Sequence, residues 1–432
     1  MAAVTAGRPR LTAALRLTAH THNLFTRPAA HRSITSEVAC LPVRVLILSA
    51  DFGSGHQAAA KAIADACRSL SSDCEAIVVP SQSALLGLFA RAYLWQIKHM
   101  PGLYRRLYQL PVSRPLRTLV ILVLSKPVRR SIEKERPDVI VGTHPFPAGA
   151  AVCLLRRARR QVPVVMALTD FAPHGFWVWP GVARYCCASP AAAADLVRRG
   201  ADAARVIVTG LPVRPHLAEL IRQSRREPSA GPGGPNRHLA DQGSAANSPR
   251  RVLLMGGGLG LGPIPEAVGA LLALPQAALR LTVICGRNEA LKEEITRRFG
   301  GDPRLTVLGF TDAVIEHMRA ADLLVTKPGG ITCAEALALG VPMLLLDPLP
   351  GHEEENARYL VETGAARVAR GPALTAAASE LLFARPDRLA AMAEAARQAG
   401  QPNAARMIAA EVLALAKRSC RAPGSVRITP PS

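Results

Sequence analysis

The chain has 432 residues, 49% of them apolar, which is enough for roughly two or three domains with hydrophobic cores. It carries 53 Lys and Arg against 32 Asp and Glu, and the formal net charge of +21 suggests a polyanionic neighbour such as nucleic acid, an acidic membrane face or a phosphorylated substrate. The nine cysteines form no CxxC pair and no apolar run is long enough to span a bilayer, which argues against a zinc site, a disulfide framework and a transmembrane helix.

Residues 1–36 contain five arginines, several Ser and Thr, and no acidic residue. This composition resembles an organellar transit peptide, and a disordered, Arg-biased N-terminus has the same composition. Both alternatives stay open. In either case we expect residues 1–40 to be an extension outside the fold.

From residue 43 onward, apolar strands alternate with helical stretches, a rhythm typical of parallel βαβ units. The pattern is interrupted at 224–251, which is rich in Gly, Pro, Ser and Asn and is typical of a flexible linker. Before it we expect a helix at 56–70 and strands within 43–49, 74–79, 137–144, 162–170, 184–189 and 205–210. After it we expect strands within 251–258, 279–286, 305–310, 321–330 and 341–348.

The sequence therefore predicts an α/β fold of two doubly wound, parallel-sheet (Rossmann-like) domains that face a ligand cleft. The expected boundaries are a first domain at 41–222, a linker at 223–250, and a second domain at 251–400. A helix at 401–418 is placed so that it can cross back over both domains, and 419–432 is expected to be a tail.

In the second domain, "TKPGGITCAEALALGVPMLLLDPLPGHEEENARYL" at 326–360 carries the strongest signal. Gly329 and Gly330 turn the chain after a strand and let a ligand approach the backbone, and a helix is expected to begin near Thr332. Free backbone N–H groups and the helix dipole favour an anion at such a helix start. Glu335 lies one turn later, where a carboxylate can accept hydrogen bonds from a ribose diol. A PGG turn by itself is an ordinary turn, and the whole string makes the site specific.

The first domain opens with "SADFGSGHQAAAKAI" at 49–63. A strand enters a turn that contains Gly55, but the turn ends in His56 instead of the Gly-Lys-Ser/Thr of a P-loop. This is an unusual place for a histidine, because such a turn normally faces a phosphate. A helix N-terminal hydrogen bond is the simplest structural explanation of His56.

Taken together, these strings resemble glycosyltransferase family 28, whose members have the GT-B fold, and in particular the monogalactosyldiacylglycerol synthases and the bacterial processive diacylglycerol glucosyltransferases. The resemblance also includes "VGTHPFPAGA", "ALTDFAPHGFWVWPGVARYCCAS" and "VTGLPVRP", in the order of the family, and it extends over about 43–400 apart from the linker. It implies an inverting hexosyltransferase that moves galactose or glucose from a UDP-sugar to the 3-hydroxyl of 1,2-diacylglycerol and so makes a membrane glycolipid.

For the donor, the resemblance implies that a glycine loop faces the diphosphate, that "CGRN" and "GFTD" hold the uracil, and that Glu335 holds the ribose. The family's "PGQE" reaches the hexose, and here His352 replaces its Gln, which leaves galactose versus glucose open. No DxD motif follows a strand, so no metal cofactor is expected, and the helix at Gly330 with Lys327 would stabilise the leaving UDP. The implied donor residues are Gly256, Gly257, Gly258, Gly260, Arg287, Phe310, Thr311, Lys327, Gly329, Gly330, Thr332, Glu335, His352, Glu353 and Asn356.

For the acceptor, the resemblance assigns His56 as the catalytic base, because imidazole titrates close enough to pH 7 to accept a hydroxyl proton. Asp170 is either the residue that orients this imidazole or a helix N-cap. Gly55, His144 and Pro145 are implied in acceptor or anionic-lipid placement, with a turn histidine as the alternative for His144. His174 and Trp177 are expected in a loop that faces the cleft, with local packing as the alternative.

Between residues 84 and 130 there are nine basic residues and no acidic ones, together with five aromatic residues and the short apolar run "LVILVL". This combination is typical of a surface that lies on anionic lipid, and Tyr93, Trp95, Arg105 and Arg106 are its expected contacts. A solvated basic face beside a core helix is the alternative. Nucleic acid is not expected as a partner, because no recognised nucleic-acid-binding motif accompanies the charge.

We therefore expect a peripheral enzyme on the cytosolic face of the cell membrane, or at a plastid envelope if residues 1–36 are a transit peptide. Three alternatives stay open. They are a transferase that adds N-acetylglucosamine to a polyprenyl-linked peptidoglycan precursor, a UDP-N-acetylglucosamine 2-epimerase-like enzyme, and a non-catalytic polyanion-binding protein.

Overall fold

The computed structural model describes residues 42–50, 54–81, 100, 102, 114–226, 249–274 and 279–421. Both domains belong to one compact unit, Pro42–Ser432. The predictions for the N-terminal extension, for the C-terminal tail beyond Arg421, for most of the linker, and for Tyr93, Trp95, Arg105 and Arg106 lie outside the described residues.

The first domain is built on a six-stranded sheet in the order β2-β1-β3-β4-β5-β6, with every pair of neighbours parallel. Each observed strand lies inside its predicted range or extends at most two residues beyond it. The agreement is expected, because strands of a parallel sheet that is covered on both faces are continuous hydrophobic segments. The strands are β1 Val43–Ala50, β2 Cys74–Ser81, β3 Val139–Gly142, β4 Val164–Ala167, β5 Arg184–Cys187 and β6 Val206–Val208.

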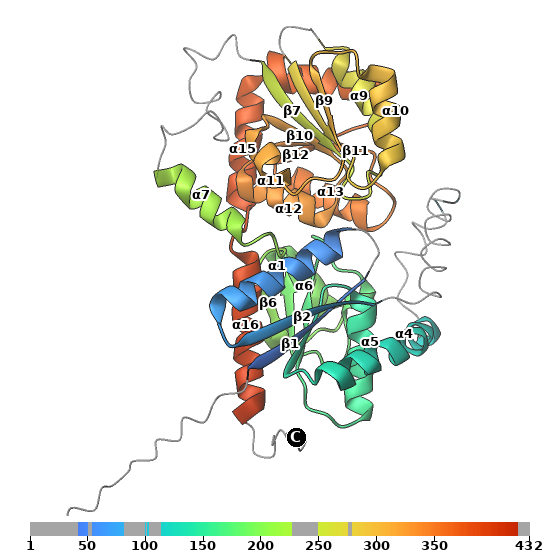
Figure 1. Ribbon diagram of the computed structural model, residues 1–432, viewed down its shortest axis with the longest axis vertical. Coiled ribbons are helices and arrows are strands. Elements are labelled where there is room, and N and C mark those ends of the chain that lie inside the picture. Colours follow the sequence, from blue (N-terminus) through green and yellow to red (C-terminus); the bar gives the residue numbers. More distant parts are fainter. Residues whose placement is uncertain are drawn as a thin grey trace, which may run out of the picture. The chain divides into compact units, whose positions relative to one another are not determined.

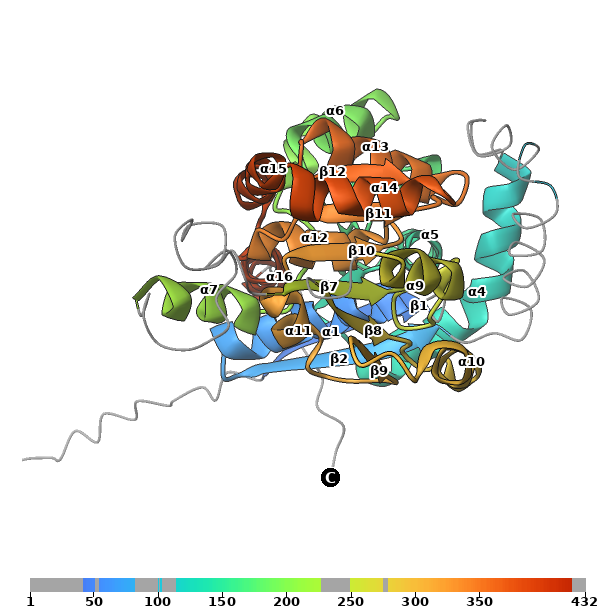
Figure 2. The same cartoon turned by 90° about the horizontal axis from the view of Figure 1, so that it is seen from above.

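The second domain repeats this arrangement with a six-stranded parallel sheet in the order β12-β11-β10-β7-β8-β9, which Figure 2 shows as a row. The strands are β7 Arg250–Met255, β8 Leu279–Ile284, β9 Leu305–Leu308, β10 Leu323–Thr326, β11 Met343–Leu346 and β12 Ala366–Ala369. The prediction of two doubly wound, parallel-sheet domains is confirmed, and β12 is a strand that the sequence pattern did not predict.

Helices cover both sheets (Figure 1). The first domain has α1 Ser54–Leu70, α4 Arg114–Glu135, α5 Pro145–Arg157, α6 Pro190–Arg198 and α7 His216–Arg226, with short 3₁₀ turns at Gly175–Trp177 and Ala203–Arg205. The second has α9 Ile264–Leu272, α10 Glu289–Phe299, α11 Val314–Ala320, α12 Gly330–Leu339, α13 His352–Glu362, α14 Ala373–Ser379, a π-helical turn Glu380–Ala384 and α15 Pro386–Ala399.

The last helix, α16 Ala404–Arg421, follows the second domain in sequence but packs against the first. Its buried face belongs to the same apolar cluster as β1, α1 and β3, and Ile408, Val412 and Ala416 are fully buried there. Figure 1 shows α16 alongside the first sheet. The chain thus returns to the first domain after it has built the second.

The basic helix α4 combines a core face with a charged one. Leu124, Val128 and Ile132 are spaced four residues apart and pack in the core of the first domain with α5, while Lys126 and Arg129 are exposed. Part of the segment 84–130, which was predicted to face the membrane, is therefore packed in the core of the first domain. Among the described helices, none is both long and apolar enough to cross a membrane.

The topology decides where a ligand can bind. In the first sheet the strand order reverses between β1 and β3, and in the second between β7 and β10. Loops at the carboxyl ends of such neighbouring strands diverge and leave a crevice. The segments that follow these four strands are the ones singled out in the sequence: Gly55–His56, Thr143–His144, the glycine loop 256–262, and Lys327–Gly330.

Candidate active site

His56 lies in the first turn of α1, after the carboxyl end of β1. Its Nδ1 atom is 2.8 Å from the backbone oxygen of Thr143, which follows β3, and 3.0 Å from Oγ1 of Thr169, which follows β4. The hydroxyl of Thr143 donates to the backbone oxygen of His56, 3.1 Å away. Three neighbouring strand ends therefore fix the position of this ring.

The contact with Thr143 also determines which nitrogen of His56 can act as a base. A carbonyl oxygen can only accept a hydrogen bond, so Nδ1 must carry the proton, and Oγ1 of Thr169 lies where it can accept from the same N–H. In the neutral ring the lone pair is then on Nε2. This is the tautomer that a base needs if Nε2 is to take a proton from a hydroxyl group.

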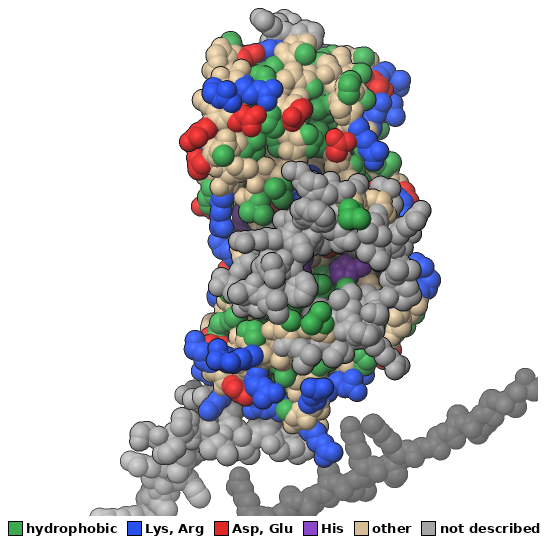
Figure 3. All heavy atoms as spheres, turned by 90° about the vertical axis from the view of Figure 1, so that its right-hand side faces the viewer, with side chains coloured by type: hydrophobic (Ala, Val, Ile, Leu, Met, Phe, Trp, Pro, Cys, Tyr) green, Lys and Arg blue, Asp and Glu red, His purple; other side chains and the backbone are tan. Residues whose placement is uncertain are grey.

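His56 is the first member of a line of aromatic rings. The His144 ring lies 4.7 Å from it in an edge-to-face arrangement, and Phe146 and Phe176 continue the line at 4.9 and 4.8 Å. His144 is the N-cap of α5, and its Nδ1 accepts from the backbone N–H of Phe146; His174 caps the following 3₁₀ turn in the same way. Figure 3 shows a histidine side chain that is visible on one face of the molecule.

Burial holds these histidines in the neutral form. It lowers the pKa of His56, although the charge of Asp170 and the hydrogen bond to Thr143 act in the opposite direction. Burial, with a contribution from His56, lowers the pKa of His144 well below its usual range, and burial lowers the pKa of His174 to about 4. Imidazole rings with lowered pKa values are available as proton acceptors at neutral pH.

On the donor side, two glycine segments approach the first domain closely. The backbone N–H of Gly258 donates to Oγ of Ser54 at the start of α1, with an N···O distance of 3.0 Å. A Cβ added to Gly258 would lie 2.6 Å from the Ser54 side chain, and one added to Gly330 would lie 1.9 Å from the backbone oxygen of Thr169. Only glycine allows these approaches.

The α12 start after β10 has the features of an anion site. The helix begins at Gly330, two residues earlier than expected, with Gly329 as N-cap and no side chain capping it. Nζ of Lys327 lies 2.8 Å from Oε1 of Glu353, which is almost fully buried, and Oε2 of Glu353 accepts from the backbone of Leu349. Gly257 lies beside Lys327, since a Cβ there would be 3.6 Å from Cε. The predicted donor residues Gly257, Lys327 and Gly330 therefore meet at the switch point of the second sheet.

The expected uracil residues also meet. The guanidinium carbon of Arg287 lies 5.2 Å from the centre of the Phe310 ring, which is 57% exposed. Asn288 caps α10, and the Thr311 hydroxyl accepts from the backbone of Ala313. An exposed aromatic face beside a planar cation can stack on a nucleobase.

Glu335 is buried inside α12, and the sequence pattern did not reveal its partner. Nε of Arg214, just before α7, lies 3.5 Å from Oε1 of Glu335. Burial raises the pKa of Glu335 to about 7, against the attraction of Arg214. Oε1 has no hydrogen-bond partner among the described residues. Arg214 stands in the quoted string "VTGLPVRP", so the motif contained the signal, but nothing in it indicated that Arg214 would meet Glu335.

Asn356 differs most from its expected role. Its Nδ2 donates to Oδ1 of Asp170 and to the backbone oxygen of Pro328, both at 3.1 Å, and its Oδ1 accepts from the backbone N–H of Phe171 at 2.8 Å. The residue is fully buried. A hydrogen bond from Asn356 to a donor sugar would require one of these bonds to break.

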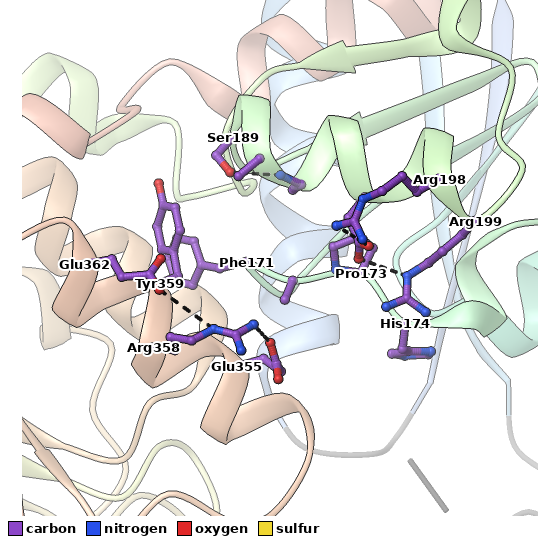
Figure 4. A pocket seen from close by; sticks show the side chains of 14 residues that line it. Phe171, Pro173, His174, Ser189, Arg198, Arg199, Glu355, Arg358, Tyr359 and Glu362 are labelled. Atoms are coloured by element: carbon purple, nitrogen blue, oxygen red, sulfur yellow. Dashed lines mark hydrogen bonds and ion pairs between the residues drawn. The ribbon is translucent and has the colours of Figure 1, made fainter. Parts of the chain in front are cut away.

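Trp177 corrects a further expectation. It was expected in a loop that faces the cleft, but its side chain has no exposed surface and packs in the core of the first domain, because the short 3₁₀ turn directs it inward. His174 from the same loop does line a cavity, together with residues of α6 and α13 (Figure 4). The cavity has a volume of about 360 Å³, and Figure 4 shows its arginines Arg198, Arg199 and Arg358 paired with carboxylates.

The remaining predicted residues lie after β1, β3 and β11. Pro145 opens α5, Gly55 stands in the first turn of α1, and His352 opens α13. Among the described residues, no group of three or more His, Cys, Asp or Glu side chains has the arrangement of a metal site.

Known proteins match both halves of the chain. Residues 56–213 match the family model for monogalactosyldiacylglycerol (MGDG) synthase, and residues 251–411 match the glycosyltransferase family 28 C-terminal domain. The processive diacylglycerol beta-glucosyltransferase of Bacillus mycoides is 29% identical over 381 residues, which are 86% of this chain and 93% of that protein. Its counterpart in Bacillus cereus matches to the same extent.

Among solved structures, Acinetobacter baumannii MurG matches with a TM-score of 0.56 and 20% identity over 86% of this chain and all of that one. A putative UDP-N-acetylglucosamine 2-epimerase from Listeria monocytogenes matches with the same TM-score and 17% identity, over 85% and 94% of the two chains. At these identities the structures establish the GT-B fold alone. The match over residues 56–213 thus places the first domain with the monogalactosyldiacylglycerol synthases, and the match over residues 251–411 places the second with the C-terminal domain of glycosyltransferase family 28.

Proposed function

We propose that this glycosyltransferase moves a hexose from a UDP-sugar to the 3-hydroxyl of 1,2-diacylglycerol, with inversion at the anomeric carbon. The names of the curated relatives and the description of the first family model support diacylglycerol as the acceptor. The single observation that carries the mechanism is the hydrogen bond between His56 Nδ1 and the Thr143 carbonyl, because it directs the basic nitrogen Nε2 away from the protein backbone.

In this mechanism Nε2 of His56 removes the proton from the acceptor hydroxyl as the oxygen attacks the anomeric carbon. The bond from that carbon to the UDP oxygen breaks on the opposite face, which accounts for inversion. Negative charge then develops on the diphosphate. The free N–H groups at the start of α12 and the ammonium group of Lys327 would stabilise it.

For the donor, Arg287 and Phe310 would hold the uracil, and Glu335 the ribose. Oε1 of Glu335 faces Arg214 at 3.5 Å but makes no hydrogen bond with the described residues, and this supports the assignment, because a ligand hydroxyl can supply the hydrogen bond that the buried oxygen lacks. Thr311, Thr332, His352 and Glu353 complete the proposed donor set, with His352 and Glu353 at the hexose. The diphosphate donors in this set are backbone amides and a lysine, so we propose that transfer needs no divalent metal.

For the acceptor, Gly55, His144, Pro145 and His174 would border the glycerol moiety. Lipid access would come from a peripheral location at the cytosolic face of the membrane. The exposed Lys126, Arg129 and Arg130 of α4 support attraction to anionic lipid, at about 1 kcal/mol per basic residue near the surface.

The test is glycolipid synthesis in vitro. Purified protein is incubated with diacylglycerol in anionic liposomes and with UDP-glucose or UDP-galactose, with and without EDTA, and the lipids are analysed. We expect a glycosyldiacylglycerol from at least one donor, at the same rate in EDTA. No glycolipid from either donor would refute the proposal, and loss of the product in EDTA would refute its metal-independent part.

A further inference from the structure

The segment Thr169–Phe171 contacts both the proposed base and the donor domain. On one side, Oγ1 of Thr169 lies 3.0 Å from Nδ1 of His56. On the other side, the backbone oxygen of Thr169 abuts Gly330, where a Cβ would lie 1.9 Å away. Three consecutive residues therefore lie between the base and the start of the helix proposed to bind the diphosphate.

Asn356 of α13 fixes this segment from the donor domain. It donates to the carboxylate of Asp170 and accepts from the backbone N–H of Phe171, which are consecutive residues of the first domain. Its second amide hydrogen goes to the backbone oxygen of Pro328, directly before the glycine turn of α12. Both hydrogens and the oxygen of the amide are thus used, so the amide orientation is determined by its partners.

Packing supports the same contact. Three residues after Asn356, the Tyr359 ring stacks on Phe171 with 4.7 Å between ring centroids and an angle of 15°. Figure 4 shows the two rings side by side. Phe171 also shares an apolar cluster with Ile331 and Ala334 of α12. The contact between the domains is therefore largely apolar beside the buried Asn356, and a buried amide in such surroundings is costly unless its partners are in place.

We propose that Asn356 is a positioning residue that couples contact between the two domains to the catalytic base: it holds Asp170 and the Thr169–Phe171 segment against His56 only when the donor domain is in place. This inference rests on the proposed function, since it assumes that His56 is the base. An enzyme built in this way has a fully assembled base only while the diphosphate site is next to it.

Asp170 is the group through which Asn356 would act. The carboxylate of Asp170 faces Asn356 on α13 and acts electrostatically on His56 of α1 and on His174 of its own loop. His352, at the start of α13, acts on the same two histidines in the opposite direction. The ring of His144 contacts His56 from α5, and Lys327 with Glu353 forms the nearby ion pair of the donor domain. A charge introduced at position 356 would therefore lie close to Asp170 and would act on His56, the proposed base.

The test compares Asn356→Asp with Asn356→Ala. In Asn356→Asp the new carboxylate keeps an acceptor for the Phe171 N–H but faces Asp170 with a like charge, so the two carboxyl groups share one proton only at lower pH. The shared proton restores the lost hydrogen bond and the single negative charge beside His56. Asn356→Ala has no such group.

We expect both variants to bind UDP within about threefold of the wild type and to lose at least about tenfold in kcat at pH 8. The activity of Asn356→Asp relative to the wild type should rise several-fold between pH 8 and pH 6, while that of Asn356→Ala stays constant. The double variant Asp170→Asn/Asn356→Ala should lose much less kcat than the product of the fold-losses of the two single variants. Asn403→Asp, the same change at an exposed asparagine before α16, serves as the control and should behave as the wild type.

Variants with wild-type turnover, equal pH dependence of Asn356→Asp and Asn356→Ala, or additive effects with Asp170→Asn would each overturn the inference. If instead the wild type forms no glycolipid while it binds UDP, the proposed function itself has failed. The two failures are thus distinguished by the wild-type reaction.

Discussion

The close approach of Gly330 to the backbone of Thr169 gives the most direct prediction. In Gly330→Ala the new Cβ would lie 1.9 Å from the Thr169 oxygen, whereas contacts of real Cβ atoms are essentially never under 3.0 Å. The two segments must therefore separate by at least 1.1 Å, the difference between these values. The Phe171–Asn356 and Asn356–Asp170 hydrogen bonds, now 2.8 and 3.1 Å, would lengthen beyond any useful distance.

If each of the two hydrogen bonds contributes about 1 kcal/mol, the form of the enzyme in which the two domains are in contact would be destabilised by about 2 kcal/mol. Its population would then fall about 30-fold. We expect a loss of this size in kcat for glycolipid formation, measured in liposomes at saturating UDP-hexose. Gly301→Ala is the control, because its Cβ would meet nothing within 4 Å. A Gly330→Ala enzyme with turnover within about threefold of the control would refute the reasoning.

Three further predictions concern individual groups. His56→Ala should bind UDP normally but transfer about 10²- to 10⁴-fold more slowly, the range for loss of a general base, whereas exposed His216→Ala should be unaffected. Phe310→Ala should weaken UDP binding by about 1–3 kcal/mol, measured by calorimetry, if its exposed ring stacks on the uracil. His174→Gln should reduce the loss of stability in acid. The folded pKa of His174, about 4, lies below the unfolded value of 6.5, so the contribution of His174 to stability is full above pH 6.5 and falls by about 3 kcal/mol between pH 6.5 and 4.

Each of these has a result that would count against it. Unchanged turnover in His56→Ala would exclude His56 as the base, and unchanged UDP affinity in Phe310→Ala would place the uracil elsewhere. For His174, the thermal midpoints of the variant and the wild type should diverge between pH 6.5 and 4. Parallel curves would mean that the imidazole is not buried as described. Glu335, whose raised pKa of about 7 has the opposite effect over part of this range, is present in both proteins and cancels in the comparison.

The strands were predictable because parallel strands covered by helices are continuous apolar runs, and such runs are visible in a single sequence. The missed strand β12 shows the limit: Ala366–Ala369 is short, holds one branched residue and one arginine, and pairs only with β11 at the edge. The start of α12 was placed two residues too late because its first turn is Gly-rich and lacks a side-chain cap.

The candidate site was predictable to the extent that topology brings the ends of β1, β3, β7 and β10 to the crevices. The directions of the side chains could not be predicted in this way. Trp177 stands in a stretch punctuated by Pro and Gly that is typical of a loop, and only the tertiary structure shows it buried. The contacts of Arg214 with Glu335 and of Asn356 with Phe171 join residues far apart in the sequence, and no local pattern encodes them.

The position of α16 has a consequence for how the protein is made. The hydrophobic surface that it covers on α1 and the first sheet belongs to residues synthesised before the second domain, while the covering helix, Ala404–Arg421, is synthesised after it. The nascent first domain therefore emerges from the ribosome with an apolar face that stays open until α16, which follows the second domain, has been translated. During that interval a chaperone or the second domain must shield it from aggregation.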